Sequence, residues 1–471
     1  MNKQKYARIM QDFPVASFTE KCSKLAFLLL CIFFLDISAF GGGRYLMIGP
    51  LSPRMITALL AFLLCIPSML QDFPALIKRP VILMFGIFGV YLLICGLRGY
   101  YGDGRMNVLL TDLKGFAWLF IVPVVLTLVK NTSRFHKLLS MVVAGAVIQA
   151  VIIFTINLLS VYILPDSKPL ESFFINAQFG VINRIHPKFY RIFTSSSPYL
   201  VIGCAIALFR QIQARKILLR YTAIISLLMC AILLSFTRSL YGCVAVVFIL
   251  AMVCIFTLLK RSFRSNLRIV IVTAVAVACT VFLTQFVFQA NYLGFAVSRT
   301  FGLPYSASAV TDNPIHLSVN MSKASDPMQE YIDMTQESDA LRTQTQKELL
   351  ALFQKNPIFG NGLGVCAPVR ITEDQPATSG LDEYFYLDML ARMGILGLVL
   401  YLLPFFYVLL QFWKQCRVLS ANLNTLALLC GMFGFLAATW FNPWMNSVLG
   451  ISTYALCCAI PTILAHSKET L

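Results

Sequence analysis

Three arginines in this sequence stand where a guanidinium could hold a phosphate group. Arg238 lies in LLSFTRSLYGCVAV, with apolar sequence on both sides and a very tight turn between two apolar stretches. A charge at or near membrane depth is expensive and marks function by default. The planar fork of arginine also binds two phosphate oxygens at once. The alternative role is an interfacial arginine that reaches lipid headgroups.

Arg191 is the second candidate for phosphate binding. It opens RIFTSSSPYLVIG, in which three consecutive serines add hydroxyls and Pro198 stands near the start of an apolar span. An arginine that anchors the outer membrane boundary fits the same position, so this residue alone leaves both roles open.

The third arginine, Arg342, falls on a helix that we predict over residues 338–355. Ser338 can serve as its N-cap, and Asn356-Pro357 stops it. On a helical projection Arg342 falls inside the apolar arc of this helix. A snorkelling arginine whose stem covers the apolar face is the alternative. If the three arginines converge on one face, they form a site for a pyrophosphate.

Two acidic residues are candidates for proton transfer. Asp382 and Glu383 stand one turn before a predicted apolar span, at the membrane surface. A carboxylate that is half-buried there can have a raised pKa and accept a proton from a hydroxyl. The alternative is a solvated pair at a helix N-terminus, where the helix dipole favours acids.

The glycine-rich run and the cysteines indicate no nucleotide or metal chemistry. Gly360-x-Gly362-x-Gly364 has no P-loop lysine after it and no strand context. We interpret these glycines as a tight turn after the predicted helix, which brings the backbone close to its neighbours. No CxxC or Cys/His spacing suggests a metal, and no histidine pairs with a nucleophile. We therefore expect no metal ion and no cofactor.

The elements that position these residues are membrane helices. With 58% hydrophobic and 13% charged residues, the composition predicts an all-α polytopic membrane protein. Apolar stretches predict about twelve transmembrane helices, with one large periplasmic loop between the ninth and tenth. The spans run approximately over 25–40, 55–71, 81–97, 115–130, 138–160, 192–209, 217–236, 239–259, 269–290, 387–412, 422–440 and 446–464.

The basic residues predict the topology. With a cytoplasmic N-terminus, the inner segments hold about twenty-one basic residues and four acidic ones. The resulting charge of these segments equals the net charge of the whole chain, +17. This is the positive-inside pattern, and it places both termini in the cytoplasm. The positive charge is spread over short loops, so it does not indicate a nucleic-acid partner.

We expect three parts along the chain. Residues 1–290 form an N-terminal membrane domain of about nine helices, and residues 291–386 form a periplasmic helical loop. Residues 387–471 form a C-terminal membrane domain of about three helices. A second outer segment, about 161–191, carries Arg191. Long loops usually carry function, so we expect the 291–386 loop to act on a substrate.

At these residues the chain resembles the O-antigen ligase and O-antigen polymerase superfamily of bacterial membrane glycosyltransferases. The segments that carry the resemblance are Arg191 with its small-residue run and Pro198, Thr237-Arg238-Ser239, Arg342, NPIFGNGLG at 356–364, Tyr386-Leu387, and GILGL at 394–398. Where ligases of the family carry a histidine, this chain has Glu383, and Tyr384 replaces the asparagine that follows. This departure favours a repeat-unit polymerase, in which Glu383 takes the role of the base.

The resemblance implies a metal-independent transferase of the bacterial inner membrane that acts in lipopolysaccharide or related polysaccharide biosynthesis. It would transfer a glycan from an undecaprenyl-pyrophosphate donor to a sugar hydroxyl of a glycan acceptor on the periplasmic face. Arg191, Arg238 and Arg342 would bind the pyrophosphate and stabilise its developing charge, with Arg342 and Glu383 as the catalytic residues. Membrane lipid is a further partner, and a chain-length regulator is a candidate.

Two other functions remain open. One is a transferase of the same superfamily, either an O-antigen ligase to lipid A-core or a protein oligosaccharyltransferase. The other is a lipid-glycan flippase or transporter that does no chemistry. A carrier predicts charged residues inside paired broken helices and short loops, whereas this chain has one dominant outer loop.

Overall fold

The structure is a computed structural model of the chain. It describes residues 14–41, 47, 51–163, 168–177, 179–186, 189–257, 263–288, 293–294, 296–297, 327–367, 384–415, 423–440 and 442–469.

Within these ranges, nine helical stretches are long and apolar enough to cross a membrane, and three shorter apolar helices accompany them. The nine are α2 (Pro14–Ala39), α3 (Pro53–Gln71), α5 (Pro80–Tyr101), the joined α6, η1 and α7 (Met106–Leu128), α8 (Thr132–Tyr162), α12 (Arg238–Thr257), α13 (Phe263–Phe288), α16 (Phe385–Lys414) and the joined α18 and α19 (Val448–Ala465). The shorter three are α10 (Pro198–Ala214), α11 (Leu219–Leu234) and α17 (Leu423–Ala438). This arrangement confirms the prediction of an all-α polytopic membrane protein.

The other elements, together with the separate pieces of the two joined spans, are short, apart from the long helix α15. They are α4 (Phe73–Ile77), α6 (Met106–Ala117), η1 (Trp118–Phe120), α7 (Ile121–Leu128), α9 (Lys168–Asn176), β1 (Gly180–His186), β2 (Phe189–Thr194), α15 (Pro327–Lys355), η6 (Trp444–Asn446), α18 (Val448–Cys458) and α19 (Ile460–Glu469). Prolines begin α3, α5 and α10, because proline lacks the N–H that the first turn of a helix leaves unpaired anyway.

The antiparallel hairpin of β1 and β2 corrects one predicted span. The sequence places the start of a membrane span at residue 192, but residues 189–194 form β2, and α10 begins only at Pro198. In β2 the buried side chains of Tyr190, Ile192 and Thr194 alternate with Arg191. This period of two belongs to a strand, and the apolar composition of the segment concealed it.

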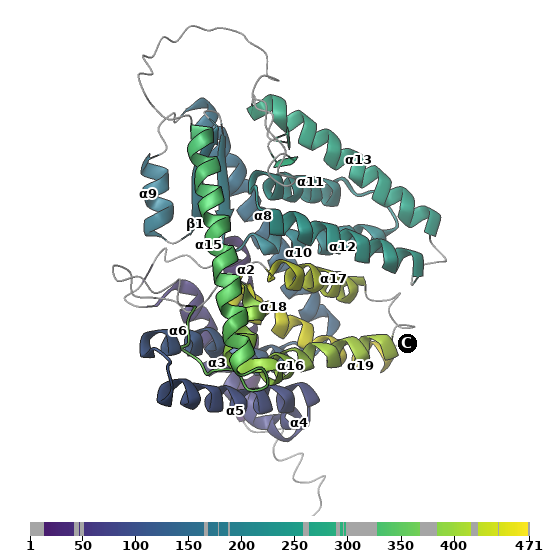
Figure 1. Cartoon of the computed structure of the whole chain (residues 1–471). Coiled ribbons are helices and arrows are strands. Elements are labelled where there is room, and N and C mark those ends of the chain that lie inside the picture. The colour runs from purple at the N-terminus through teal and green to yellow at the C-terminus, as the bar shows by residue number, and fades with distance from the viewer. Residues whose placement is uncertain are drawn as a thin grey trace, which may run out of the picture.

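The long helix α15 is the second correction. The predicted helix over 338–355 ends where the structure ends it, at Lys355 before Asn356-Pro357. Its start is wrong, because the helix begins at Pro327, so Ser338 lies inside it and is not an N-cap. In Figure 1, α15 runs across the direction of α12, α13 and α17 instead of beside them, and it contacts β1 and α16. It therefore lies over one end of the membrane helices.

Two helices form the centre of the bundle. α10 packs against α8, α11, α12 and α17, and almost all its side chains are buried. Every residue of α18 is buried as well. Because α10 follows directly after β2, the packed centre of the bundle fixes the position of Arg191 on that strand.

Candidate functional site

The structure brings the elements that carry the three arginines to the same end of the bundle. Arg191 lies on β2, Arg238 is the first residue of α12, and Arg342 lies in the second half of α15. The guanidinium of Arg191 connects the other two sites, because it contacts the turn before Arg238 and is an electrostatic neighbour of Arg342.

The first connection runs from β2 to the turn between α11 and α12. The Nε of Arg191 donates a hydrogen bond to the carbonyl oxygen of Ser235 at 3.3 Å. The hydroxyl of Thr237 donates to the same oxygen at 3.0 Å. Arg238 follows three residues after Ser235 and its side chain is exposed. The bond therefore holds β2 against the turn that presents Arg238.

This turn is held in an unusual backbone conformation. Phe236 has a φ of 47° although its side chain is fully buried. The left-handed region is unfavourable for a bulky residue, and it persists only when surrounding contacts enforce it. The hydroxyl of Tyr241 donates to the carbonyl of Leu233 at 2.9 Å and closes the turn from the α12 side. The position of Arg238 is thus set by tertiary packing.

The second connection is between two positive charges. Burial and the neighbouring charge of Arg342 lower the pKa of Arg191 to about 10, and the nearby Tyr241 acts in the opposite direction. Arg191 therefore keeps its proton at neutral pH. Two guanidiniums that are held close together in a half-buried place repel each other, and an anion bound between them would relieve that repulsion.

Neither predicted acid can be placed, since Asp382 and Glu383 lie outside the described residues. The next residue, Tyr384, packs against a small cluster of Leu349, Ala367 and Ala391. Leu349 lies seven residues after Arg342 on α15. This is about 10 Å along the helix at its usual rise.

The serines after Arg191 have a structural role. Ser196 and Ser197 are fully buried. The Ser197 hydroxyl accepts a bond from the backbone N–H of Thr194 at 3.2 Å, and the Ser196 hydroxyl donates to the carbonyl of Ala39 at 3.3 Å. These two hydroxyls therefore fasten the corner between β2 and α10 and are turned away from a substrate.

The glycine run forms the predicted turn and close approach. Gly360, Gly362 and Gly364 all have positive φ, and a Cβ on Gly362 would meet the backbone of Gly99 at 2.5 Å. The turn also fills a break in α16, where Gly394 has a φ of 67°. There the backbone N–H groups of Asn361 and Gly362 donate to the carbonyls of Ala391 and Arg392. The interpretation as a geometric element is confirmed.

Sequence reasoning missed a buried ionic cluster beside this turn. Arg392 of α16 contacts Asp112 of α6 at 2.6 Å and Asp388 of α16 at 2.8 Å, and all three side chains are almost fully buried. Asp112 also accepts a bond from the backbone N–H of Gly364 at 2.9 Å. The sequence contained a sign of this cluster. Asp388 and Arg392 are four residues apart in a mostly apolar stretch, and residues at this spacing lie on the same face of a helix.

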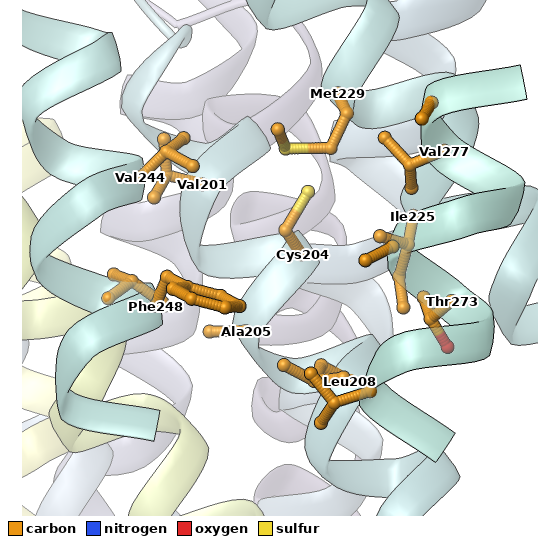
Figure 2. Close-up of a pocket in the computed structure, with 14 residues that line it drawn as sticks. Val201, Cys204, Ala205, Leu208, Ile225, Met229, Val244, Phe248, Thr273 and Val277 are labelled. Carbon is orange, nitrogen blue, oxygen red and sulfur yellow. The ribbon is translucent and has the colours of Figure 1, made fainter. Parts of the chain in front are cut away.

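An apolar cavity of about 290 Å³ lies among α10, α11, α12 and α13. Figure 2 shows Val244 and Phe248 of α12 on one side of it and Thr273 and Val277 of α13 on the other. Val244 stands six residues after Arg238. That is about 9 Å along α12, so the cavity begins less than two helical turns from the arginine.

The fold and the site define a multi-pass membrane protein with clustered cations at one end of its helices. The family model described as O-antigen ligase matches residues 221–402, a range that includes Arg238, Arg342 and the glycine run. This match supports the resemblance to the O-antigen ligase and polymerase superfamily over that part of the chain, and members of that family are membrane enzymes of the glycosyltransferase type. No curated protein and no solved structure matches the chain.

Proposed function

We propose that the protein is a polymerase of lipid-linked polysaccharide repeat units in the bacterial inner membrane. It transfers a glycan from an undecaprenyl-pyrophosphate donor to a sugar hydroxyl of the acceptor glycan on the periplasmic face, with both termini in the cytoplasm. In this proposal residues 291–386 are a periplasmic unit between the membrane domains 1–290 and 387–471.

The observation that carries the proposal is the contact of Arg191 with the turn before Arg238 and its proximity to Arg342. Three cations from three separate segments suit a ligand with several negative oxygens, and a pyrophosphate has that charge. The leaving group of the reaction gains charge as its bond to the sugar breaks. Guanidiniums that are already in position stabilise this charge without reorganisation.

The reaction follows from these roles. The acceptor hydroxyl oxygen bonds to the anomeric carbon of the donor glycan, and the bond from that carbon to the pyrophosphate oxygen breaks. Undecaprenyl pyrophosphate leaves with the electron pair, held by Arg191, Arg238 and Arg342. The hydroxyl proton goes to the carboxylate of Glu383, which acts as the general base.

The apolar cavity suits the lipid part of the donor. Its lining from α10 to α13 is almost entirely hydrocarbon (Figure 2). Val244 in this lining stands six residues after Arg238. A prenyl chain that lies there would place its pyrophosphate at the arginine end of the helices.

Two other functions are less well supported. A ligase or a protein oligosaccharyltransferase would use the same donor site, and the exchange of the family histidine for Glu383 favours the polymerase. A carrier would use broken helices to bind its substrate. The break at Gly394 is instead filled by the turn at 357–362, whose backbone pairs with that of α16 on both sides of the break.

Deletion of the gene, followed by electrophoresis of the surface polysaccharide, tests the proposed function. We expect single repeat units on the lipid acceptor in place of long chains. Bare core with polymer accumulated on undecaprenyl pyrophosphate would establish a ligase instead. Normal polysaccharide would refute both transferases.

Complementation with variants tests the site. Arg238→Ala should restore no long chains although the protein inserts at the normal level, while Lys347→Gln, which removes an exposed charge from α15, should restore them fully. Glu383→Gln should lower the transfer rate by about 10²- to 10⁴-fold, the usual contribution of a general base. Normal chain length with Glu383→Gln would place the base elsewhere.

A further inference from the structure

A second cationic site lies at the C-terminal end of α15, thirteen residues beyond Arg342. A cavity of about 460 Å³ opens there between the end of α15, the turn that follows it and the corner between α5 and α6. Three of the residues around it are basic: Arg98, Arg105 and Lys355. Asp103 is the one acid in the lining.

The three cations are exposed, and none of their side chains forms an ion pair with a carboxylate in the part of the chain that the structure describes. This separates them from Arg392, whose charge is balanced by two aspartates. The cavity thus has a surplus of positive charge that is available to an anion from outside.

The walls of the cavity are fixed by backbone contacts. The N–H of Arg105 donates to the carbonyl of Gly364 at 3.0 Å. The amide of Asn361, which lines the cavity, donates to the carbonyls of Leu352 and Ala391 at 2.7 and 2.8 Å. The basic side chains therefore extend from a preorganised frame that joins α6, α15 and α16.

Apolar side chains flank the cavity on two sides. Tyr101 and Met106 are exposed at the corner between α5 and α6, and Ile358 and Phe359 are exposed just after Asn356 in the turn. Tyrosines beside exposed aliphatic residues are typical of the boundary between lipid and water. A ligand with an anionic head and a hydrocarbon tail would satisfy both kinds of surface.

The spacing along α15 relates the two cationic sites. Arg342 and Lys355 are thirteen residues apart on one continuous helix. This corresponds to about 20 Å, a separation on the scale of an oligosaccharide rather than of one sugar. In the proposed reaction, the acceptor glycan reacts at one end and carries its own lipid pyrophosphate at the other.

We infer that the cavity of Arg98, Arg105 and Lys355 binds the phosphate head of the membrane-anchored acceptor, whose glycan extends along α15 towards Arg342. This inference rests on the proposed function, since it assigns one lipid-linked substrate to the middle of α15 and the other to its C-terminal end. The donor pyrophosphate occupies the site of Arg191, Arg238 and Arg342, and the acceptor pyrophosphate occupies the second.

Native mass spectrometry of the full-length protein in detergent, with undecaprenyl pyrophosphate without glycan as the probe, counts the sites. We expect two bound copies on the wild type, and one on the triple variant Arg98→Gln, Arg105→Gln, Lys355→Gln. One copy should also bind to Arg342→Gln, and two to the control Lys347→Gln. The exchanged side chains are exposed, except for the partly buried Arg342, and equal thermal melting of all variants would confirm that they fold.

Two further arms identify the ligand. Excess phosphatidylglycerol should leave the second copy bound, and displacement by this lipid would overturn the assignment to a prenyl pyrophosphate. In a reconstituted transfer assay, the triple variant should raise the KM for acceptor by about ten- to a hundredfold, as expected for lost charged contacts, with little change in kcat.

The results separate this inference from the proposed function. If no glycan is transferred by any variant but the second copy is lost in the triple variant, the proposed reaction fails and the site remains a prenyl-phosphate site. If transfer proceeds and the triple variant keeps two copies and a normal KM for acceptor, the inference is wrong and the polymerase stands.

Discussion

Two groups of charged residues in this protein use arginine in opposite ways. Arg392 lies almost fully buried between two aspartates, and the backbone N–H of Gly364 adds a further bond to Asp112. Arg191 is half-buried and has Arg342 as a charged neighbour. The first group is internally neutralised, whereas the second brings two positive charges close together.

The difference suits two roles: Arg392 stabilises the fold, and Arg191 and Arg342 bind a ligand in the proposed function. A buried arginine whose carboxylates are already supplied is balanced in charge, and it fastens the elements that supply them, here α6, α16 and the glycine turn. Like charges held side by side destabilise the empty site and favour an incoming anion. Predictions for the two groups therefore concern different quantities, stability for one and activity for the other.

Arg392→Ala should have the largest effect, because it leaves two buried carboxylates without their cation. Breaking a buried ion pair in this way costs about 3–5 kcal/mol. We expect a loss of folded protein, measured as the amount in the membrane fraction and the melting temperature after purification. Lys414→Ala, at the exposed opposite end of α16, is the matched control and should melt like the wild type. A normal melting temperature for Arg392→Ala would contradict the structural role.

Arg342→Ala should leave the protein folded and impair the reaction. Removal of one positioned donor to a developing negative charge costs about 10²- to 10³-fold in rate. Because the variant also removes a charge that repels Arg191, its melting temperature should be equal to or above that of the wild type. Measuring both the transfer rate and the melting temperature shows whether Arg342 acts in the reaction or in the fold. A large loss of stability would assign Arg342 to the structural group.

Asp112→Asn tests how much one of the two aspartates contributes to the stability of the buried group. Arg392 keeps Asp388, and an amide still offers an oxygen, so the expected destabilisation is about 1–3 kcal/mol, as for a weakened buried hydrogen bond. Chemical denaturation of the purified protein measures it, with the transfer rate per folded molecule expected to stay near normal. A loss of activity without a loss of stability would mean that this cluster contacts a substrate.

Arg191→Lys should have the smallest of these effects. Lysine keeps the positive charge, but it lacks the Nε that donates to Ser235 and the planar fork that binds two oxygens. We expect about a tenfold loss in the rate of transfer, close to the loss of one hydrogen bond to a charged group. An unchanged rate would show that only the charge matters, and a loss as large as that of Arg342→Ala would make the fork essential.

The fold was predictable because membrane helices depend on length and apolarity alone. Each predicted span overlaps a helix or a joined pair of helices of the structure. Two predicted boundaries were wrong, the start of the span at residue 192 and the start of α15, because apolarity does not mark either position. Residues 189–194 alternate as a strand within an apolar run, and the first turns of α15 are polar, so no apolar periodicity marks its start at Pro327.

The site was only partly predictable. The proximity of Arg191 and Arg342 depends on α15 lying against β1, which no local pattern encodes. The turn before Arg238 takes its shape from the buried Phe236, whose positive φ is a product of packing. The cluster around Arg392 was within reach of sequence reasoning, because Asp388 and Arg392 stand one helical turn apart.

The break of α16 at Gly394 also has a consequence for the depth at which the protein sits in the bilayer. The part of α16 that follows, from Ile395 to Lys414, has twenty residues, which is about 30 Å of helix and enough to cross the hydrocarbon layer by itself. The part before the break, with Asp388 and Arg392, then lies at the level of the headgroups. Because this ion cluster is buried between α6 and α16, it would fix the point at which α16 enters the hydrocarbon layer through packing inside the protein.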